Sequence, residues 1–357
     1  MSLLDKIKKN TTIKDSAILS KSKLFVDKDM IPTKIPVVNI ALSGKLDGGL
    51  TPGLTMWAGP SKHFKTAFSL LMAKAYLDKY DDAVILFYDS EFGTPKSYFE
   101  TFQIDQERVI HTPLTDVEQL KFDIMNQLKE VTRGDHLMII VDSIGNLASK
   151  KEVEDALEQK SVGDMTRAKQ IKSLFRMVTP HLTLKDIPMV VVNHTYMEIG
   201  MFPKAIVGGG TGSYYSADNI FILGRQQEKD GSELLGYNFI INVEKSRYVK
   251  EKAKIPITVM FEGGISKYSG LLEIALESGH VVKPSNGWYA RVNTETGEVE
   301  DKKFRIKDTD TREFWSKILK DKTFLEWIKK NYSYGANSIY SSYDEEASIE
   351  EEEEEDA

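Results

Sequence analysis

The sequence predicts an α/β protein built on a mostly parallel central sheet that helices flank on both faces. Between residues 31 and 270, short apolar runs alternate with amphipathic helical patterns, as in repeated strand–helix–strand units. Two of these runs, VILFYD and LMIIVD, are apolar almost throughout, as expected for central strands that are covered on both faces. A third observation is a loop with the composition of a phosphate-binding turn, placed between the first apolar run and the first helical one.

The individual elements follow from the same periodicities. We expect strands at residues 54–58, 83–89, 137–142, 189–193, 219–223, 239–244 and 255–261. We expect helices at residues 66–80, 95–103, 116–132 and 165–185, the last interrupted near Pro180. A lysine-rich helical unit at residues 1–30 precedes them, and the Ile-Pro pairs at 31–32 and 35–36 favour extended chain. Further helical patterning surrounds Trp315 and Trp327.

Composition narrows the possible function classes. Of the 357 residues, 41% are hydrophobic and 28% are charged, which is typical of a globular protein in water. No run approaches the roughly 20 apolar residues of a membrane span. The absence of cysteine excludes disulfides, thiolate metal sites and thiol nucleophiles. Because the first residues lack the pattern of a secretion signal, we expect a cytoplasmic protein without membrane contact.

The charge is unevenly distributed. The net charge is −7, but ten carboxylates lie between Asp344 and Asp356, and removing their ten negative charges leaves +3 on the rest. We expect the acidic segment at 337–357 to be disordered, because it has too few apolar residues to form a core. A mildly basic body with an acidic tail is compatible with nucleic-acid binding.

The loop at residues 58–66, AGPSKHFKT, is the most informative motif. In a strand–loop–helix context, backbone N–H groups of such a loop bind phosphate oxygens, Lys65 reaches the β- and γ-phosphates, and Thr66 holds Mg²⁺. Phe64 departs from the GxxxxGK[ST] pattern at its second glycine, so an ordinary lysine-rich turn is the alternative. The candidate nucleotide contacts are Gly59, Pro60, Ser61, Lys62, His63, Phe64, Lys65 and Thr66.

Two carboxylates follow neighbouring apolar runs. Asp142 ends LMIIVD, and Glu91 comes just after VILFYD. Because ligands of open α/β sheets bind at the carboxyl ends of strands, Asp142 is a candidate for the magnesium shell and Glu91 for polarising an attacking water. Either acid alone could simply cap the next helix. Together with the loop, they predict an ATP site.

At this point the chain resembles the RecA family of recombinases, and within it the UvsX recombinases of T4-type phages. The segments that carry the resemblance are 34–36, 39–44, 58–66, 87–93, 141–151, 192–196 and 208–212. It extends from about residue 20 to about residue 290, and the last 60 or so residues resemble the family least. The resemblance implies an N-terminal protomer-docking unit at 1–30, a RecA-like P-loop ATPase core at 31–270, a small C-terminal subdomain at 271–336 and the acidic tail.

The resemblance also implies roles for single residues. Lys65, Thr66, Glu91 and Asp142 keep the roles given above, with Glu91 as the catalytic carboxylate. Tyr98 lies seven residues after Glu91, where the family places a tyrosine that stacks on adenine. The alternative for Tyr98 is an aromatic side chain that faces the core.

Three further residues are implied to act in catalysis. His194 stands where the family usually has a glutamine that senses the γ-phosphate, although it could be a purely structural histidine. Lys245 and Arg247, alternate residues at a strand end, would point the same way and reach the ATP of a neighbouring protomer. An ordinary solvated strand face is the alternative for this pair.

Two stretches, 149–164 and 195–216, are predicted to be DNA-contacting loops without structure of their own. Glycines there permit close approach of a phosphate chain, and aromatic side chains can stack on bases. Disordered linkers are the alternative. The candidate DNA contacts are Lys150, Lys151, Lys160, Arg167, Lys204, Gly208, Gly209, Gly210 and Tyr214.

The resemblance therefore implies a DNA-dependent ATPase that uses ATP and Mg²⁺ and exchanges DNA strands within helical filaments on single-stranded DNA. Its expected partners are single-stranded and double-stranded DNA, further copies of itself with ATP between them, a recombination mediator and a single-strand-binding protein. Its expected location is the cytoplasm of an infected bacterial cell. A hexameric helicase or another motor with a RecA-like core is the alternative, and a non-hydrolysing nucleotide-gated scaffold is a third possibility.

Overall fold

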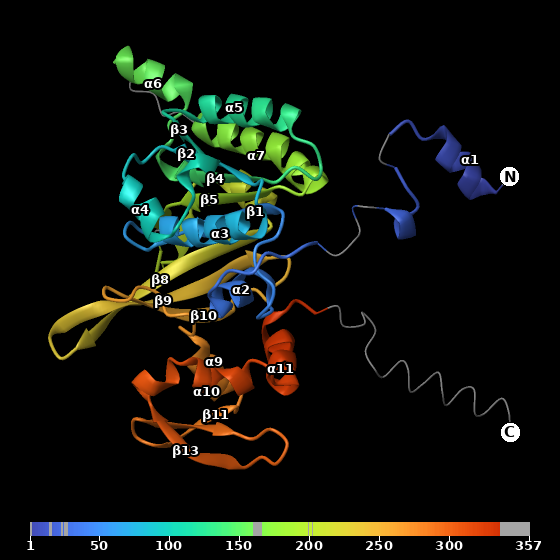
Figure 1. Ribbon diagram of the computed structural model, residues 1–357. Coiled ribbons are helices and arrows are strands. Elements are labelled where there is room, and N and C mark those ends of the chain that lie inside the picture. The colour runs from blue at the N-terminus through green and yellow to red at the C-terminus, as the bar shows by residue number, and fades with distance from the viewer. Residues whose placement is uncertain are drawn as a thin grey trace.

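The structure is a computed structural model that describes residues 2–13, 16–22, 24, 28–159, 166–198, 200–201 and 203–335 (Figure 1). The predicted acidic tail, Lys160, and parts of the N-terminal unit and of both DNA-contacting stretches lie outside the described residues.

The core is an eight-stranded sheet with the order β10-β9-β8-β1-β5-β4-β2-β3. Six of its strands, from β8 to β3, run parallel, whereas β9 and β10 are antiparallel additions at one edge. This confirms the predicted fold class. The strands are β1 (Gly53–Ala58), β2 (Val84–Asp89), β3 (Val109–Pro113), β4 (Leu137–Asp142), β5 (Pro188–Asn193), β8 (Asn219–Asp230), β9 (Glu233–Ser246) and β10 (Lys254–Met260).

All seven predicted strands are present, but β3 was not predicted. It is a partly exposed edge strand whose residues lack a long apolar run. Strands β8 and β9 are also longer than expected and form a hairpin that projects beyond the sheet at the left of Figure 1. Polar residues dominate the outer part of this hairpin, so a search for apolar runs does not detect it.

Helices cover both faces of the sheet (Figure 1). One face packs against α5 (Val117–Glu130) and α7 (Thr166–Lys185), and the other against α2 (Pro36–Ser43) and α3 (Lys65–Lys79). The predicted interruption of α7 near Pro180 is wrong, because Pro180 lies on its exposed side while Val178 and Leu182 hold the helix to the core. At the second Ile-Pro pair, Ile35 is extended as predicted, with φ −112° and ψ 102°, but Pro36 is not, because proline suits the first turn of a helix and begins α2.

A smaller C-terminal unit lies below the core in Figure 1. Helices α10 (Arg312–Ile318) and α11 (Lys322–Tyr332) confirm the patterning around the two tryptophans. Sequence analysis did not predict the antiparallel sheet of β11 (Val281–Ser285), β12 (Trp288–Val292) and β13 (Val299–Arg305), nor α9 (Leu271–Glu277).

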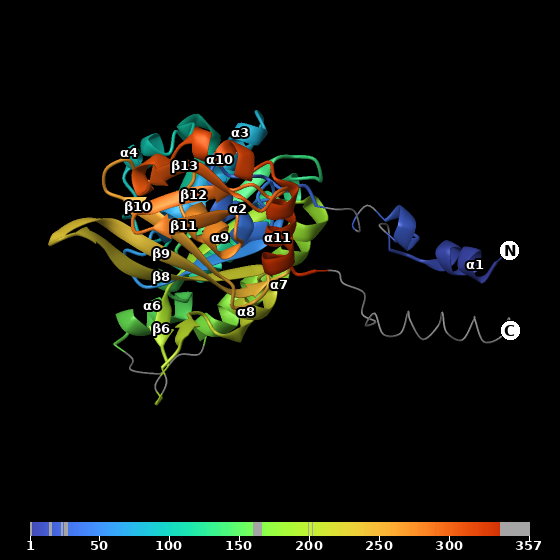
Figure 2. The ribbon, with the colours of Figure 1, turned by 90° about the horizontal axis from the view of Figure 1, so that it is seen from below.

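At the other end of the chain, α1 (Leu3–Asn10) lies away from the core, and none of its residues is buried (Figures 1 and 2). Within the described ranges, no helix combines the length and the apolar character that crossing a membrane requires.

Candidate nucleotide-binding site

The phosphate loop joins β1 to α3 at the carboxyl edge of the sheet. Phe64 ends the loop with φ 63° and ψ 16°, the left-handed conformation that glycine normally supplies at this point. Such a backbone costs a non-glycine residue about 1–2 kcal/mol. The Phe64 ring packs against Phe239, with ring centres 5.6 Å apart, and against Phe68 at 6.4 Å. Aromatic packing of Phe64 therefore helps to hold the loop in the conformation that the motif normally obtains from a glycine at this position.

Lys65 and Thr66 begin α3 inside this loop. The Lys65 Nζ donates to the Pro60 carbonyl at 2.8 Å, and its side chain is largely buried. Burial lowers the pKa of Lys65, while the charges of Glu91 and Asp142 act to raise it. An ammonium held over a loop in this way is placed to bind phosphate oxygens.

Asp142, at the end of β4, faces the start of α3. Its Oδ2 accepts a hydrogen bond from the Thr66 hydroxyl at 2.5 Å, and its Oδ1 is buried without a hydrogen-bond partner among the described residues. Burial raises the pKa of Asp142 to about 6. A hydroxyl and a carboxylate with a free oxygen suit Mg²⁺, which typically takes one or two carboxylates and completes its shell with phosphates and water. Within the described ranges, no group of three or more histidine, aspartate or glutamate side chains is arranged to hold a metal ion.

Glu91 and His194 meet from two different strand ends. The His194 Nε2 lies 3.0 Å from the Glu91 Oε1 and 3.4 Å from the Ser143 hydroxyl. The hydrogen bond to His194 is the largest cause of a lowered pKa for Glu91, so this carboxylate is charged at neutral pH. A Cβ on Gly145 would lie 2.5 Å from the His194 ring, so glycine makes room for that ring.

Sequence analysis missed a set of residues that orient Glu91. The Asp89 Oδ1 accepts from the backbone N–H groups of Glu91 at 3.0 Å and Phe92 at 2.8 Å, and its Oδ2 lies 3.2 Å from the His111 ring. The Ser90 hydroxyl donates to the Ser143 carbonyl at 2.6 Å, next to a cis Asp142–Ser143 peptide. The segment Asp89-Ser90-Glu91 was visible in the sequence, but its hydrogen-bond partners were not.

A cavity of about 400 Å³ collects most of the predicted nucleotide contacts. Tyr98, on α4 (Lys96–Thr101), lines this cavity, and its ring also packs edge-on against Phe102 at 5.2 Å. The structure is thus compatible with both interpretations of Tyr98. The other predicted residues that line the cavity are Ser61, Lys62, His63, Phe64, Lys65, Thr66, Glu91 and His194.

Lys245 and Arg247 do not line this cavity. The Lys245 Nζ donates to the Tyr214 and Tyr215 carbonyls at 2.7 and 3.2 Å, and Arg247 forms an ion pair with Asp218. Within one protomer, both cations therefore contact residues 214–218 rather than the phosphate loop.

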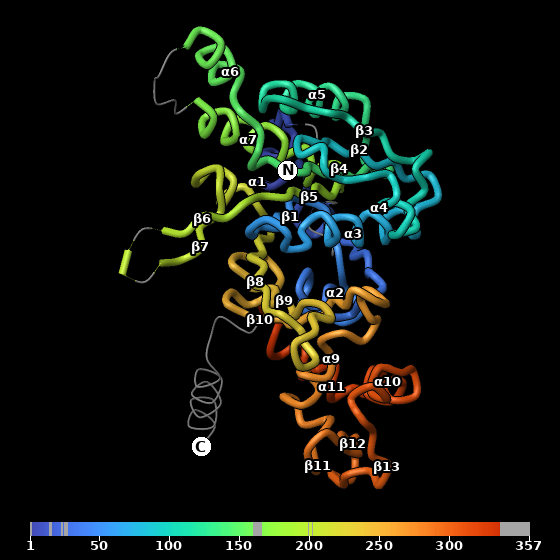
Figure 3. The backbone as a smooth tube through the Cα atoms, turned by 90° about the vertical axis from the view of Figure 1, so that its left-hand side faces the viewer, coloured from blue at the N-terminus to red at the C-terminus, as the bar shows by residue number. Residues whose placement is uncertain are grey.

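The two predicted DNA-contacting stretches have more structure than expected. The first contains α6 (Lys150–Leu157), which exposes Lys150 and Lys151. The second contains β6 (Thr195–Met197), β7 (Ala205–Val207) and α8 (Thr211–Ser216), with Lys204 exposed just before β7. In the described parts of these stretches, capping at Ser149 and the pairing of β6 with β7 satisfy backbone groups locally. Figures 2 and 3 show α6 and the β6–β7 hairpin on the same side of the molecule.

Arg167 differs from our expectation. Its guanidinium donates to the carbonyls of Ile144, Gly145 and Leu147 at 2.6–3.1 Å, so it braces the turn after β4 instead of standing free for DNA phosphates. A DNA contact by Arg167 would require some of these hydrogen bonds to be given up.

The glycine segment 208–210 connects directly to the cavity. The Gly208 N–H donates to the His194 carbonyl at 2.9 Å, and the Asn193 side chain donates to the Gly208 carbonyl at 2.8 Å. A shift of His194 would therefore move the base of the second candidate DNA segment.

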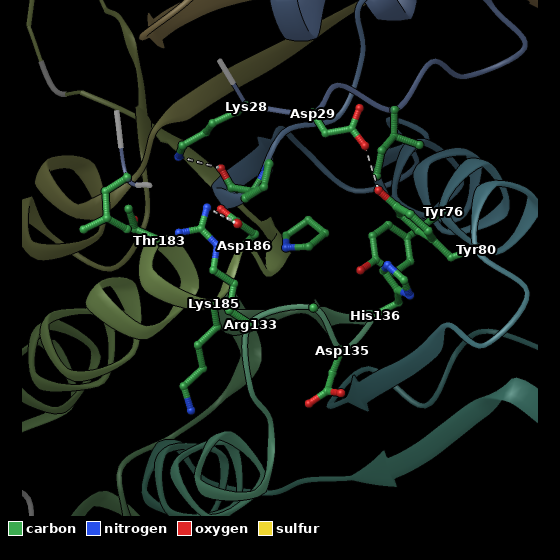
Figure 4. A pocket seen from close by; sticks show the side chains of 15 residues that line it. Lys28, Asp29, Tyr76, Tyr80, Arg133, Asp135, His136, Thr183, Lys185 and Asp186 are labelled. Atoms are coloured by element: carbon green, nitrogen blue, oxygen red, sulfur yellow. Dashed lines mark hydrogen bonds and ion pairs between the residues drawn. The ribbon is translucent and has the colours of Figure 1, made fainter. Parts of the chain in front are cut away.

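A second cavity, of about 370 Å³, lies at the opposite edge of the sheet, where the strands begin. Figure 4 shows Tyr76, Tyr80 and His136 along one side of it and Arg133 with Asp186 along another. Tyr80 stacks on His136 with ring centres 3.8 Å apart. None of the residues predicted to bind nucleotide lines this cavity.

The parallel sheet and the loop at its carboxyl edge define a P-loop nucleotide-binding protein. Comparison with known proteins narrows this class. Residues 3–266 match the family model described as RecA N-terminal domain, and the chain belongs to the RecA family. Residues 268–328 match the C-terminal domain of the bacteriophage T4 recombination and repair protein, so the likeness continues beyond residue 290, where we expected it to end.

Individual relatives agree with the family assignment. The chain is 54% identical to the recombination and repair protein of Enterobacteria phage T4, over 94% of this chain and 86% of that protein. It is 27% identical to protein RecA of Bacteroides thetaiotaomicron, over 85% of this chain and 90% of the relative. With protein RecA of Nocardia farcinica the identity is 25%, over 81% and 83% of the two chains.

Proposed function

We propose that the protein is an ATP-dependent DNA recombinase that forms helical filaments on single-stranded DNA and catalyses homologous pairing and strand exchange. Recombination, repair and recombination-dependent replication are the processes it would serve. The observation that carries the proposal is that Glu91 and His194 line the same cavity as the phosphate loop, while the His194 carbonyl accepts a hydrogen bond from Gly208 in the glycine segment. The names and high coverage of the relatives support the same function.

The geometry supports a division of labour in ATP hydrolysis. Lys65 and the N–H groups of the loop would bind the phosphates, and Thr66 with Asp142 would hold Mg²⁺, which neutralises phosphate charge when bound. Glu91, charged and fixed by Asp89, would orient the attacking water and accept its proton. His194 would contact the γ-phosphate and exchange that contact for its present one with Glu91.

The nucleotide state would then reach DNA through the glycine segment. Lys150, Lys151 and Lys204 would contact phosphates, together with backbone amides at 208–210. The Lys245 ammonium lies 5.4 Å from the centre of the Tyr214 ring, so a substitution of either residue would affect the other. Lys160, which lies outside the described residues, is proposed from the sequence alone to contact DNA as well.

Assembly would place ATP between protomers. Helix α1 exposes Leu3, Leu4 and Ile7, which suit docking on an adjacent protomer. Lys245 and Arg247 would leave their contacts with residues 214–218 and reach the neighbour's ATP. A mediator and a single-strand-binding protein would act with the filament, in the cytoplasm of an infected bacterial cell.

Electron microscopy of the protein with single-stranded DNA and a non-hydrolysable ATP analogue tests this proposal. Long helical filaments are expected, whereas closed rings would support the helicase alternative. Mixing Lys65→Ala with Lys245→Ala protein adds a test of the shared site. Some hydrolysis should return, because each mixed interface can contain one intact half of each kind, and strictly additive loss at every ratio would argue against ATP between protomers.

A further inference from the structure

The phosphate loop contains two residues in a backbone conformation that favours glycine. Lys62 has φ 60° and Phe64 has φ 63°. Residues in such conformations persist only where surrounding contacts hold them. Besides the contacts with α3, this loop is held by residues of β8 and β9, which lie about 160 residues further along the chain.

Arg225 on β8 makes the central contact. Its Nη1 donates to the Lys62 carbonyl at 2.9 Å, and its guanidinium lies 4.5 Å from the centre of the Tyr237 ring. Arg225 is directly opposite Phe239 in the strand register, and Phe239 packs against both Phe64 and the His63 ring. One face of the β8–β9 hairpin therefore holds both strained positions of the loop.

The direction of the Lys62 carbonyl has a consequence for phosphate binding. In a planar trans peptide, the carbonyl of one residue and the N–H of the next point in opposite directions. Fixing the Lys62 carbonyl on Arg225 therefore turns the His63 N–H away from β8. The loop residues from Ser61 to Lys65 line the cavity described above, so this N–H orientation is set before a nucleotide arrives.

We propose that Arg225 is a positioning residue for nucleotide binding, which holds the strained phosphate loop in its binding conformation without contacting the phosphates. The inference rests on the proposed function and assigns one face of the β8–β9 hairpin to the nucleotide site. The outer end of the hairpin extends beyond the sheet (Figure 1).

Titration of the full-length protein with fluorescent ADP and ATP analogues tests this role. Arg225→Ala should weaken both nucleotides about tenfold, the size expected for losing a hydrogen bond to a charged donor at an exposed site. Lys229→Ala removes a cation from the outer part of the same hairpin and should bind both nucleotides as the natural chain does. Arg225→Lys, which keeps the charge but not the planar fork, should fall in between.

Two substitutions of Lys62, each combined with Arg225→Ala, show whether Arg225 acts by holding the loop conformation. Lys62→Gly removes the backbone strain and the lysine side chain, and Lys62→Ala removes the side chain only. Adding Arg225→Ala to Lys62→Gly should lower nucleotide affinity by less than about threefold. Adding it to Lys62→Ala should lower nucleotide affinity by about tenfold. Equal costs in both, or wild-type affinity for Arg225→Ala, would overturn the inference. Failure of the natural chain to bind either nucleotide would instead overturn the proposed function.

Discussion

The two edges of the central sheet carry cavities of similar volume and opposite character. At the edge where strands begin, charged and polar groups have partners: Arg133 pairs with Asp186 at 2.5 Å, and the His136 ring lies within hydrogen-bond distance of Asp82, at 2.7 Å. At the edge where strands end, Asp142 is buried with a raised pKa and an unpaired oxygen. The comparison teaches that volume does not identify a functional site, whereas strain and unfavourable buried charge do.

Lys65→Ala should produce the largest difference between the edges. Removing an ammonium that makes several charge-assisted hydrogen bonds to phosphates should reduce ATP hydrolysis by about 10³-fold or more. Arg133→Ala, at the other edge, should leave hydrolysis within about twofold, because it removes only a half-exposed ion pair. A phosphate-release assay checks both variants. Equal losses of hydrolysis in the two variants would contradict the assignment of the nucleotide site to the strand-end edge.

Glu91→Gln should separate binding from chemistry at the strand-end edge. The amide keeps the size and polarity of the side chain but cannot accept a proton, so hydrolysis should fall about 10²–10⁴-fold. ATP affinity and filament formation should persist. Single-turnover hydrolysis and nucleotide titration check the two parts, and lost affinity with unchanged turnover would contradict the assigned role.

Asp142→Asn should stabilise the metal-free protein. The folded pKa of about 6 lies above the ordinary value of 3.8, so the folded state holds this proton more tightly than the unfolded chain. Protonated Asp142 therefore contributes to the unfolding free energy, by roughly 3 kcal/mol at most. This contribution is fully present below pH 4 and is lost as the pH rises through 6. Asparagine resembles the neutral acid and avoids the loss, so the variant should be the more stable protein at pH 7.

Denaturant unfolding with EDTA at pH 4 and pH 7 measures this effect. The stability difference between Asp142→Asn and the natural chain should grow with pH, while added Mg²⁺ and ATP should stabilise the natural chain only. A difference that is constant with pH would contradict the burial argument for this carboxylate.

The smallest effect is expected at the strand-beginning edge. The Asp29 carboxylate accepts from the Tyr80 hydroxyl at 2.9 Å and pairs with Lys79, which lowers its pKa. Because Asp29 is largely exposed, Asp29→Ala should lower the unfolding free energy by no more than about 1 kcal/mol. Nucleotide affinity should not change in the same titration, and a clear weakening would mean that the two edges are coupled through α3.

The parts of this molecule that sequence analysis predicted are those fixed by local pattern. Continuous apolar runs identified the central strands. The loop motif with strand-end acids selected Lys65, Thr66, Glu91 and Asp142 as candidates, and the fold brings them to the same edge of the sheet. Edge strand β3, the C-terminal sheet and the hairpin at 195–207 were missed because strand pairing stabilises them more than their own composition does. Arg225 and Asp89 were missed because their roles depend on partners that only the folded chain brings near.

Photo-crosslinking with 8-azido-ATP, followed by mass spectrometry of the labelled peptides, tests the central claim most directly, because it locates the nucleotide without altering the chain. We expect the label on the peptide that contains Tyr98 or on the phosphate loop at residues 59–66, and excess ATP should prevent it. Labelling of the peptides around Tyr76, Tyr80 or His136 would place the nucleotide at the opposite edge of the sheet and contradict the account.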